Sequence, residues 1–112
     1  MKDTRLSAYR IMWLFVFFDL PTDTKKDRKN YMRFRKGLMK DGFTMMQYSV
    51  YTRHCASKES STVHTKRVEM IMPPKGNVNI LEITDKQYST MKSFWGAESK
   101  PAKPPPPQLE MF

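Results

Sequence analysis

The sequence predicts an α+β fold whose elements follow the order strand, helix, strand, strand, helix, strand. Three observations predict it. An apolar aromatic run covers residues 11–18, a strongly basic amphipathic segment begins at residue 24, and extended segments at residues 43–54 and 78–84 lie on either side of a second helical pattern. This order of elements is that of the split βαβ, or ferredoxin-like, arrangement.

Residues 11–18 predict the first strand. All eight are apolar and most are bulky, which is typical of a strand buried on both faces, and Asp19 and Pro21 follow where the strand ends. The run is far shorter than the roughly 20 residues that a membrane-spanning helix needs. Cations precede it, as in a signal peptide, but Asp and Pro stand where small residues and a cleavage site belong. We therefore expect no association with a membrane.

The first helix begins at Thr24, because a hydroxyl residue followed three positions later by Asp27 has the spacing of a capping box. An apolar stripe at helical spacing faces the core and consists of Tyr31, Phe34 and Leu38. Gly42 ends the helix, since glycine is favoured just past a helix end.

The opposite face of this helix is basic. Between residues 23 and 41, eight Lys and Arg residues stand against three Asp residues, and the whole chain has a formal net charge of +9. Cations at the start of a helix add to its positive dipole end and predict a row of phosphate contacts, so an anionic partner such as nucleic acid follows. The alternative is a charged surface that only faces solvent.

Residues 43–54 predict two extended strands with a kink near Ser49, because Tyr, Val and Thr are frequent there. Several side chains in this segment are of a kind that stacks on nucleobases. They are Tyr48, Tyr51 and the pair Met45 and Met46. The alternative is that they form core or dimer contacts.

The rest of the folded part follows from spacing and helix breakers. Residues 57–62 are typical of a turn-rich break, after which apolar residues at helical spacing predict a second helix that ends at Pro73. The last strand covers residues 78–84, with an alternation that shifts phase at Leu81. A short C-terminal helix is predicted over residues 85–96.

A chain of 112 residues has the size of one domain, which we place at residues 1–96. Residues 97–112 predict a Pro-rich extended tail, since they hold five of the eight prolines and cannot pack a core. The tail ends in large apolar residues, so we expect it to dock in a groove of a partner protein.

Asp19 is the residue that the sequence singles out for chemistry. It directly follows the first strand and precedes a Pro that turns the chain away, so its carboxylate is expected at the end of the sheet. Hard cations such as Mg²⁺ bind through carboxylates and waters and can activate water against a phosphodiester. One Asp is not a site, but a two-fold dimer would bring two together. The alternative is an Asp that caps a turn.

Other chemistries are disfavoured. Cys55 is the only cysteine, which excludes an intramolecular disulfide and a CxxC zinc site and is typical of a reducing cytoplasm. His54 is adjacent to it and cannot face the same side of a strand, so a Cys/His catalytic pair is not expected. Four glycines leave little scope for a glycine-rich phosphate loop.

Five separated segments carry a specific pattern: residues 17–22 (FFDLPT), 31–36 (YMRFRK), 41–43 (DGF), 47–51 (QYSVY) and 83–88 (ITDKQY). In this order and at this spacing they closely resemble the small CRISPR-associated adaptation protein family, often called CRISPR-associated protein two, in the branch found in type II systems. The resemblance extends from about Ile11 to Gly96.

The resemblance implies a ferredoxin-like homodimer that takes part in spacer acquisition for antiviral defence. Such a dimer bridges two dimers of the CRISPR integrase, which supplies the transesterification chemistry, and binds the double-stranded prespacer DNA through its backbone. The residues in the stretch that binds DNA are Lys25, Lys26, Arg28 and Lys29, with Arg33 on the same basic helix. The C-terminal segment of the family commonly engages the partner subunit or the integrase.

The resemblance also implies an alternative in which the protein is an enzyme. Several family members are magnesium-dependent endonucleases on RNA or double-stranded DNA, and the Asp after the first strand binds the metal. That position is Asp19, which is therefore the candidate catalytic and metal-binding residue, with Mg²⁺ as cofactor. An RNA-recognition module is a third alternative, but the aromatic motif it needs on the third strand is missing, since the nearest string, Gly42-Phe43, follows the first helix.

Overall fold

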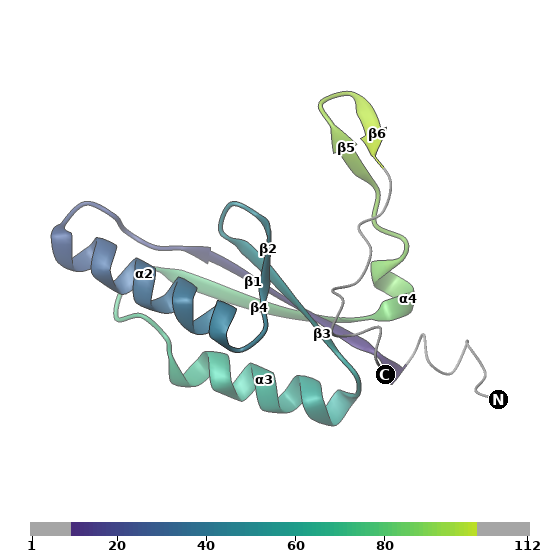
Figure 1. Ribbon diagram of the computed structural model, residues 1–112, viewed down its shortest axis with the longest axis horizontal. Helices are drawn as coiled ribbons and strands as arrows, with labels where there is room; N and C mark the ends of the chain where they lie inside the picture. The colour runs from purple at the N-terminus through teal and green to yellow at the C-terminus, as the bar shows by residue number, and fades with distance from the viewer. Residues whose placement is uncertain (1–9, 101–112) are drawn as a thin grey trace.

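The computed structural model describes residues 10–100 and confirms the α+β fold and the order of its main elements (Figure 1). Four strands form an antiparallel sheet in the order β2-β3-β1-β4. The strands are β1 (Met12–Asp19), β2 (Thr44–Gln47), β3 (Val50–Cys55) and β4 (Asn77–Thr84). The helices α2 (Lys25–Lys40) and α3 (Lys58–Met70) both lie on one face of this sheet. Two adjacent central strands and two edge strands in this order make the sheet ferredoxin-like.

The central strand β1 carries the core. Alternate side chains of a strand point to opposite faces, and the even-numbered residues of β1 face the helices. They pack with side chains of both helices in one buried cluster, which includes Met12, Leu14, Val16, Phe18, Phe34, Leu38 and Val68. Each fully buried side chain of this size contributes about 1.5–3 kcal/mol. The burial predicted for both faces of this strand holds from residue 12 to residue 16.

Helix α2 begins as predicted. The Asp27 amide donates to the Thr24 hydroxyl at 3.0 Å, and the Thr24 amide donates to the Asp27 carboxylate at 3.2 Å, which completes the capping box. Further along, α2 lies close to the end of α3, because a Cβ atom at Gly37 would stand only 2.7 Å from Ile71 Cδ1. The Ile71 side chain therefore packs directly over residue 37, in the space that a Cβ atom there would occupy.

Helix α3 begins earlier than the spacing of apolar residues predicts. Residues 57–62, expected to form a break, are the cap and first turns of α3, and the Ser57 hydroxyl accepts the Ser60 amide at 3.0 Å. The inward-facing residue of this first turn is Ser61, which is fully buried and donates to the Glu82 carboxylate. Because a hydroxyl group occupies a core position here, hydrophobic periodicity does not reveal the start of the helix.

The C-terminal helix is shorter than predicted. Helix α4 covers only Asp85–Tyr88, and the strands β5 (Ser93–Trp95) and β6 (Glu98–Lys100) form a hairpin that stands away from the four-stranded sheet (Figure 1). The hydroxyls of Ser89 and Thr90 donate to the carbonyls of the last helical turn at 2.7 and 2.6 Å, which ends the helix. Of the predicted Pro-rich tail, residues 101–112 lie outside the described residues.

Helix α4 covers part of the sheet face that α2 and α3 leave free. The rings of Tyr88 and Trp13 stack with centroids 3.8 Å apart, and the Trp13 indole N–H donates to Asp85 at 2.7 Å. The His54 ring contacts the same indole edge-on at 4.9 Å. One end of this face is therefore closed, while Phe17 and Leu81 stay partly exposed toward its other end.

Polar contacts hold α3 in place. Asp41, at the end of α2, accepts from His64 Nδ1 at 2.7 Å and from Arg67 at 2.9 Å. On the strand side, the Glu82 carboxylate accepts from Lys58 and Ser61. Burial raises the pKa of Glu82, but these two hydrogen bonds outweigh it and leave the pKa below its ordinary value. Charged and polar groups thus hold both ends of α3, in addition to the burial of Val68 in the core.

Stability should fall in mild acid because of His54. Burial lowers the pKa of His54 in the folded protein, so the unfolded chain binds the proton more readily, and stability is lost as pH falls below the ordinary value of 6.5. We expect the decrease in Tm between pH 7 and pH 5 to be smaller in His54→Gln than in the wild type. Thermal unfolding followed by circular dichroism checks this. Equal decreases in both proteins contradict it, and between pH 7.5 and 8.5 both should behave alike.

Candidate nucleic-acid interface

The basic side chains of α2 lie on its outer, solvent-facing surface. All five predicted nucleic-acid-binding residues are exposed: Lys25, Lys26, Arg28, Lys29 and Arg33. Lys36 and Lys40 continue the exposed basic surface to the end of the helix, over about 22 Å, roughly the length of six base pairs. Within residues 10–98, none of these seven cations forms a salt bridge. The surface therefore presents uncompensated positive charge, which we call the α2 basic surface.

The first turn of α2 carries cations against the preference of the helix. Lys25 and Lys26 are its first two residues, where the helix dipole favours acidic side chains. The acidic residue of this turn, Asp27, is buried and used in the capping box. Helix stability therefore does not account for these lysines, which stand where a helix N-terminus favours an anion.

Arg28 has a structural role as well. Its guanidinium donates from one nitrogen to the carbonyls of Thr22 and Asp23, at 3.1 and 3.2 Å. These bonds fix the connection between β1 and α2. Sequence reasoning grouped Arg28 with the phosphate-binding residues, and the structure shows that its side chain also holds the loop that follows Asp19.

Asp19 lies where the sequence placed it, exposed at the last position of β1. Strand alternation puts it on the same face of the sheet as Phe17, opposite the helices. The loop that leads into β4 packs directly against it, since a Cβ atom at Gly76 would lie 2.7 Å from the Asp19 carbonyl oxygen and from Leu20. This packing holds the backbone that carries the carboxylate in place.

The turn between β2 and β3 reaches the same end of β1. The Phe18 amide donates to the Ser49 carbonyl at 3.1 Å, and Ser49 adopts the left-handed φ of 62° that confirms the predicted kink. Tyr48 is 76% exposed at this turn. Hydrogen bonding and charge interaction with Tyr31 raise the pKa of Tyr48, and the nearby Asp19 carboxylate adds to the rise. Asp19, Tyr31, Tyr48 and Ser49 thus meet at one end of the sheet.

Tyr51 is not available for stacking on a base. Its ring is 1% exposed and packs against Phe18, with centroids 5.6 Å apart. Tyr51 is therefore a core residue, as the alternative to base stacking predicted, whereas Tyr48 at the turn is exposed to solvent.

The described residues of one chain offer Asp19 as the candidate metal ligand at this end of the sheet. No group of three or more His, Cys, Asp or Glu side chains that could hold a metal ion is found among them. The other groups near Asp19 are hydroxyls and carbonyls, which are hard oxygen donors of the kind that Mg²⁺ takes together with water. The donor chemistry fits Mg²⁺, but a complete site needs further carboxylates.

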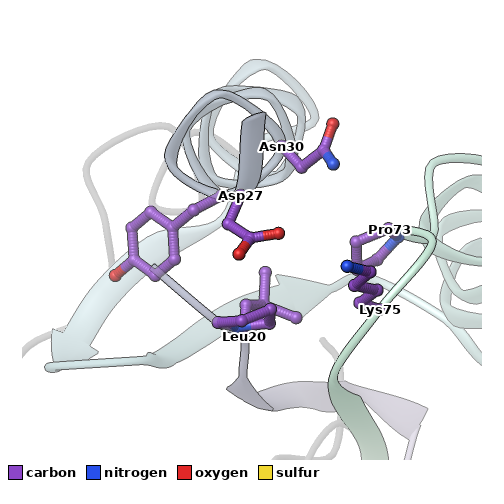
Figure 2. Close-up of a pocket in the computed structure, with 7 residues that line it drawn as sticks. Leu20, Asp27, Asn30, Pro73 and Lys75 are labelled. Atoms are coloured by element: carbon purple, nitrogen blue, oxygen red, sulfur yellow. The ribbon is translucent and has the colours of Figure 1, made fainter. Parts of the chain in front are cut away.

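A small recess lies between the start of α2 and the loop that precedes β4 (Figure 2). It is lined by Leu20, Pro21, Asp27, Asn30, Tyr31, Pro73 and Lys75. The Asp27 carboxylate points toward Leu20 in this recess, but it already accepts the Thr24 amide. The capping box accounts for this carboxylate.

The free face of the sheet is apolar around Phe17 and Leu81. Their side chains are 37% and 47% exposed, and Leu81 pairs across the sheet with Phe15. The predicted phase shift at Leu81 does not occur, because the register of β4 with β1 is continuous from Asn77 to Thr84. Leu81 simply points away from the helices, so an apolar strip lies beside Asp19.

Sequence reasoning missed the position of Gly76 and the convergence of Tyr48 with Asp19. The antiparallel register of β1 with β3 brings Val50 opposite Phe17, and hence the preceding turn to the end of β1. A residue-by-residue pairing of the two predicted strands could have found this contact. The close approach of Gly76 has no local signal beyond the turn that glycine favours.

No helix among residues 10–98 has the length and apolar content needed to span a membrane.

Comparison with known proteins gives a consistent result. The family described as CRISPR associated protein Cas2 matches residues 12–91. The chain is 49% identical over 109 residues to the CRISPR-associated endoribonuclease Cas2 of Flavobacterium psychrophilum, covering 97% of this chain and 95% of that protein. It is 54% identical over 101 residues to the protein of the same name from Parvibaculum lavamentivorans, covering 90% of this chain and all of that one.

The contact between Gly76 and Asp19 can be tested with a matched pair of variants. Gly76 and Gly96 both have positive φ, but a Cβ atom meets backbone and side chain at residue 76 and nothing within 4 Å at residue 96. In both Gly76→Ala and Gly96→Ala, placing alanine in the left-handed conformation costs about 1–2 kcal/mol of stability. We expect a clearly larger loss of Tm in Gly76→Ala in thermal unfolding, and equal losses would show that the loop does not brace Asp19.

Proposed function

This chain belongs to the CRISPR-associated protein Cas2 family, and from this premise we propose that it is a DNA-binding subunit of the machinery that acquires CRISPR spacers. It forms a homodimer that bridges integrase dimers and holds the double-stranded prespacer by its backbone. The α2 basic surface is the observation that carries this proposal. A row of unpaired cations on one helix contacts phosphates without reading base edges, so binding is independent of sequence.

The free face of the sheet supports the homodimer. Phe17 and Leu81 leave an apolar strip that helices do not cover. Packing two copies through this face would bury the strip and leave α2 exposed on both outer sides of the dimer, because α2 covers the opposite face of each sheet. A two-fold dimer of this kind has two identical ends, which is the symmetry that bridging two integrase dimers requires.

A second candidate function is an endonuclease that uses Asp19 from both subunits. The relatives from F. psychrophilum and P. lavamentivorans carry the name endoribonuclease, and Asp19 is exposed on the face that the dimer would use. Mg²⁺, when bound, supplies Lewis-acid activation of water toward a phosphodiester. The Asp19 carboxylates would hold the ion, and the packing of Gly76 fixes the backbone that aims them.

Charge reversal on α2 tests the DNA-binding function. We expect Lys25→Glu, Lys26→Glu and Lys29→Glu together to weaken duplex binding about equally for unrelated sequences, and to reduce the slope of log K against log salt by up to about 0.9 per lost contact. Arg28 is left intact because it holds the loop after β1. Fluorescence anisotropy at several salt concentrations measures both quantities.

The matched control is the triple variant Lys66→Glu, Lys86→Glu and Lys92→Glu, which changes net charge equally at exposed sites outside α2. It should retain most of the affinity. Acidic residues at the start of α2 favour its dipole, so the α2 variant should stay folded. Equal losses in both triple variants would mean that only the overall charge matters, and binding as tight as the wild type would reject the α2 basic surface.

Asp19→Asn separates the two candidate functions. The change keeps the shape of the side chain and removes its charge, so we expect DNA binding and spacer integration with the cognate integrase to be retained, and Mg²⁺-dependent cleavage of RNA to be lost. Gel assays of integration and of RNA cleavage measure the two activities. Loss of integration in an assembled complex would contradict a purely structural role, and cleavage that persists would exclude Asp19 as its centre.

A further inference from the structure

We infer that Tyr48 stacks on an unpaired nucleobase and thereby positions the nucleic-acid strand at Asp19. The inference rests on the endonuclease function proposed for Asp19. It adds a residue that binds the base next to the reacting phosphate. Tyr48 is therefore a positioning residue, whose role is to hold the strand while the carboxylate acts.

The first step is that Tyr48 is placed by the fold beside Asp19. The Ser49 carbonyl accepts the Phe18 amide at 3.1 Å, which ties the β2–β3 turn to the residue before Asp19. Tyr31 packs edge-on against Phe18 at 5.8 Å and interacts with Tyr48. The position of the Tyr48 side chain thus depends on contacts with β1 and α2, and not only on its own turn.

The second step is that the ring is available. Tyr48 is 76% exposed, whereas Tyr51, three residues later on the same hairpin, is 1% exposed. The turn that presents Tyr48 contains Ser49 with φ 62°, a conformation that residues other than glycine rarely adopt. The turn connects β2 to β3, but core packing does not account for an aromatic ring that the turn leaves exposed to water.

The third step is what the ring can do there. The hydroxyl of Tyr48 interacts with Tyr31. The aromatic face remains as the binding group, and such a face binds bases of any sequence. A base can reach it only when it is free of a duplex stack, so Tyr48 serves single strands or frayed ends.

The test measures binding of a short fluorescein-labelled single-stranded RNA and of the matching duplex without Mg²⁺, so that no cleavage occurs. We expect Tyr48→Ala to weaken single-strand binding by about 10-fold, within the range for loss of one stacked base, and to leave duplex binding unchanged. Tyr48→Phe keeps the aromatic face and should bind like the wild type. Phe94→Ala removes another exposed aromatic ring, on β5, and should have no effect.

Three results would overturn the inference. They are unchanged single-strand binding in Tyr48→Ala, an equal loss in Tyr48→Phe, and a change in the mass of Tyr48→Ala by light scattering, which would make the ring a subunit contact. Failure of the endonuclease proposal itself is distinguishable, because it appears as RNA cleavage that Asp19→Asn does not reduce. If Asp19→Asn abolishes cleavage while Tyr48→Ala binds normally, only the role of Tyr48 is rejected.

Discussion

The burial of β1 on both faces is the constraint on which the rest of the structure depends. The strand pairs with β3 on one side and with β4 on the other, so its register fixes both neighbours. Its even residues bury the stripes of α2 and α3, and Trp13 on the other face holds α4. A shift in the register of β1 would expose the buried side chains of one face. The position of Asp19 at the end of the strand is therefore fixed.

The sequence allowed those elements to be predicted whose signals are local. The aromatic run before Asp19 and the capping box at Thr24 gave β1 and the start of α2, because a strand buried on both faces and a capped helix each leave a continuous pattern. The start of α3 could not be found in this way, since Ser61 makes its inward contact through a hydrogen bond. The prediction of a helix over residues 85–96 was wrong for β5 because Tyr88, Met91 and Trp95 have a spacing near that of a helix, and β6 falls in the segment predicted as the Pro-rich tail.

In the candidate site, too, the residues with local sequence signals could be predicted and those positioned by tertiary contacts could not. Asp19 and the basic residues of α2 could be predicted, because one follows from a strand end and the others from a charge count. The neighbours of Asp19 could not, since Tyr48 and Gly76 reach it through the register of β3 and β4 with β1. Composition could not separate Tyr48 from Tyr51 either, because their roles differ only in whether a tertiary contact covers the ring.

The two proposed activities of this Cas2 protein lie on different surfaces. Helix α2 covers one face of the sheet and its lysines are exposed to solvent, whereas alternation along β1 puts Asp19 on the opposite, free face of the sheet. The charges that bind a duplex backbone and the carboxylate proposed for hydrolysis therefore share no side chain, and the loop held by Arg28 is their main physical link. Such a separation lets a chain serve as a scaffold for DNA whether or not its carboxylate acts, because a change at the carboxylate removes none of the charges that bind the duplex.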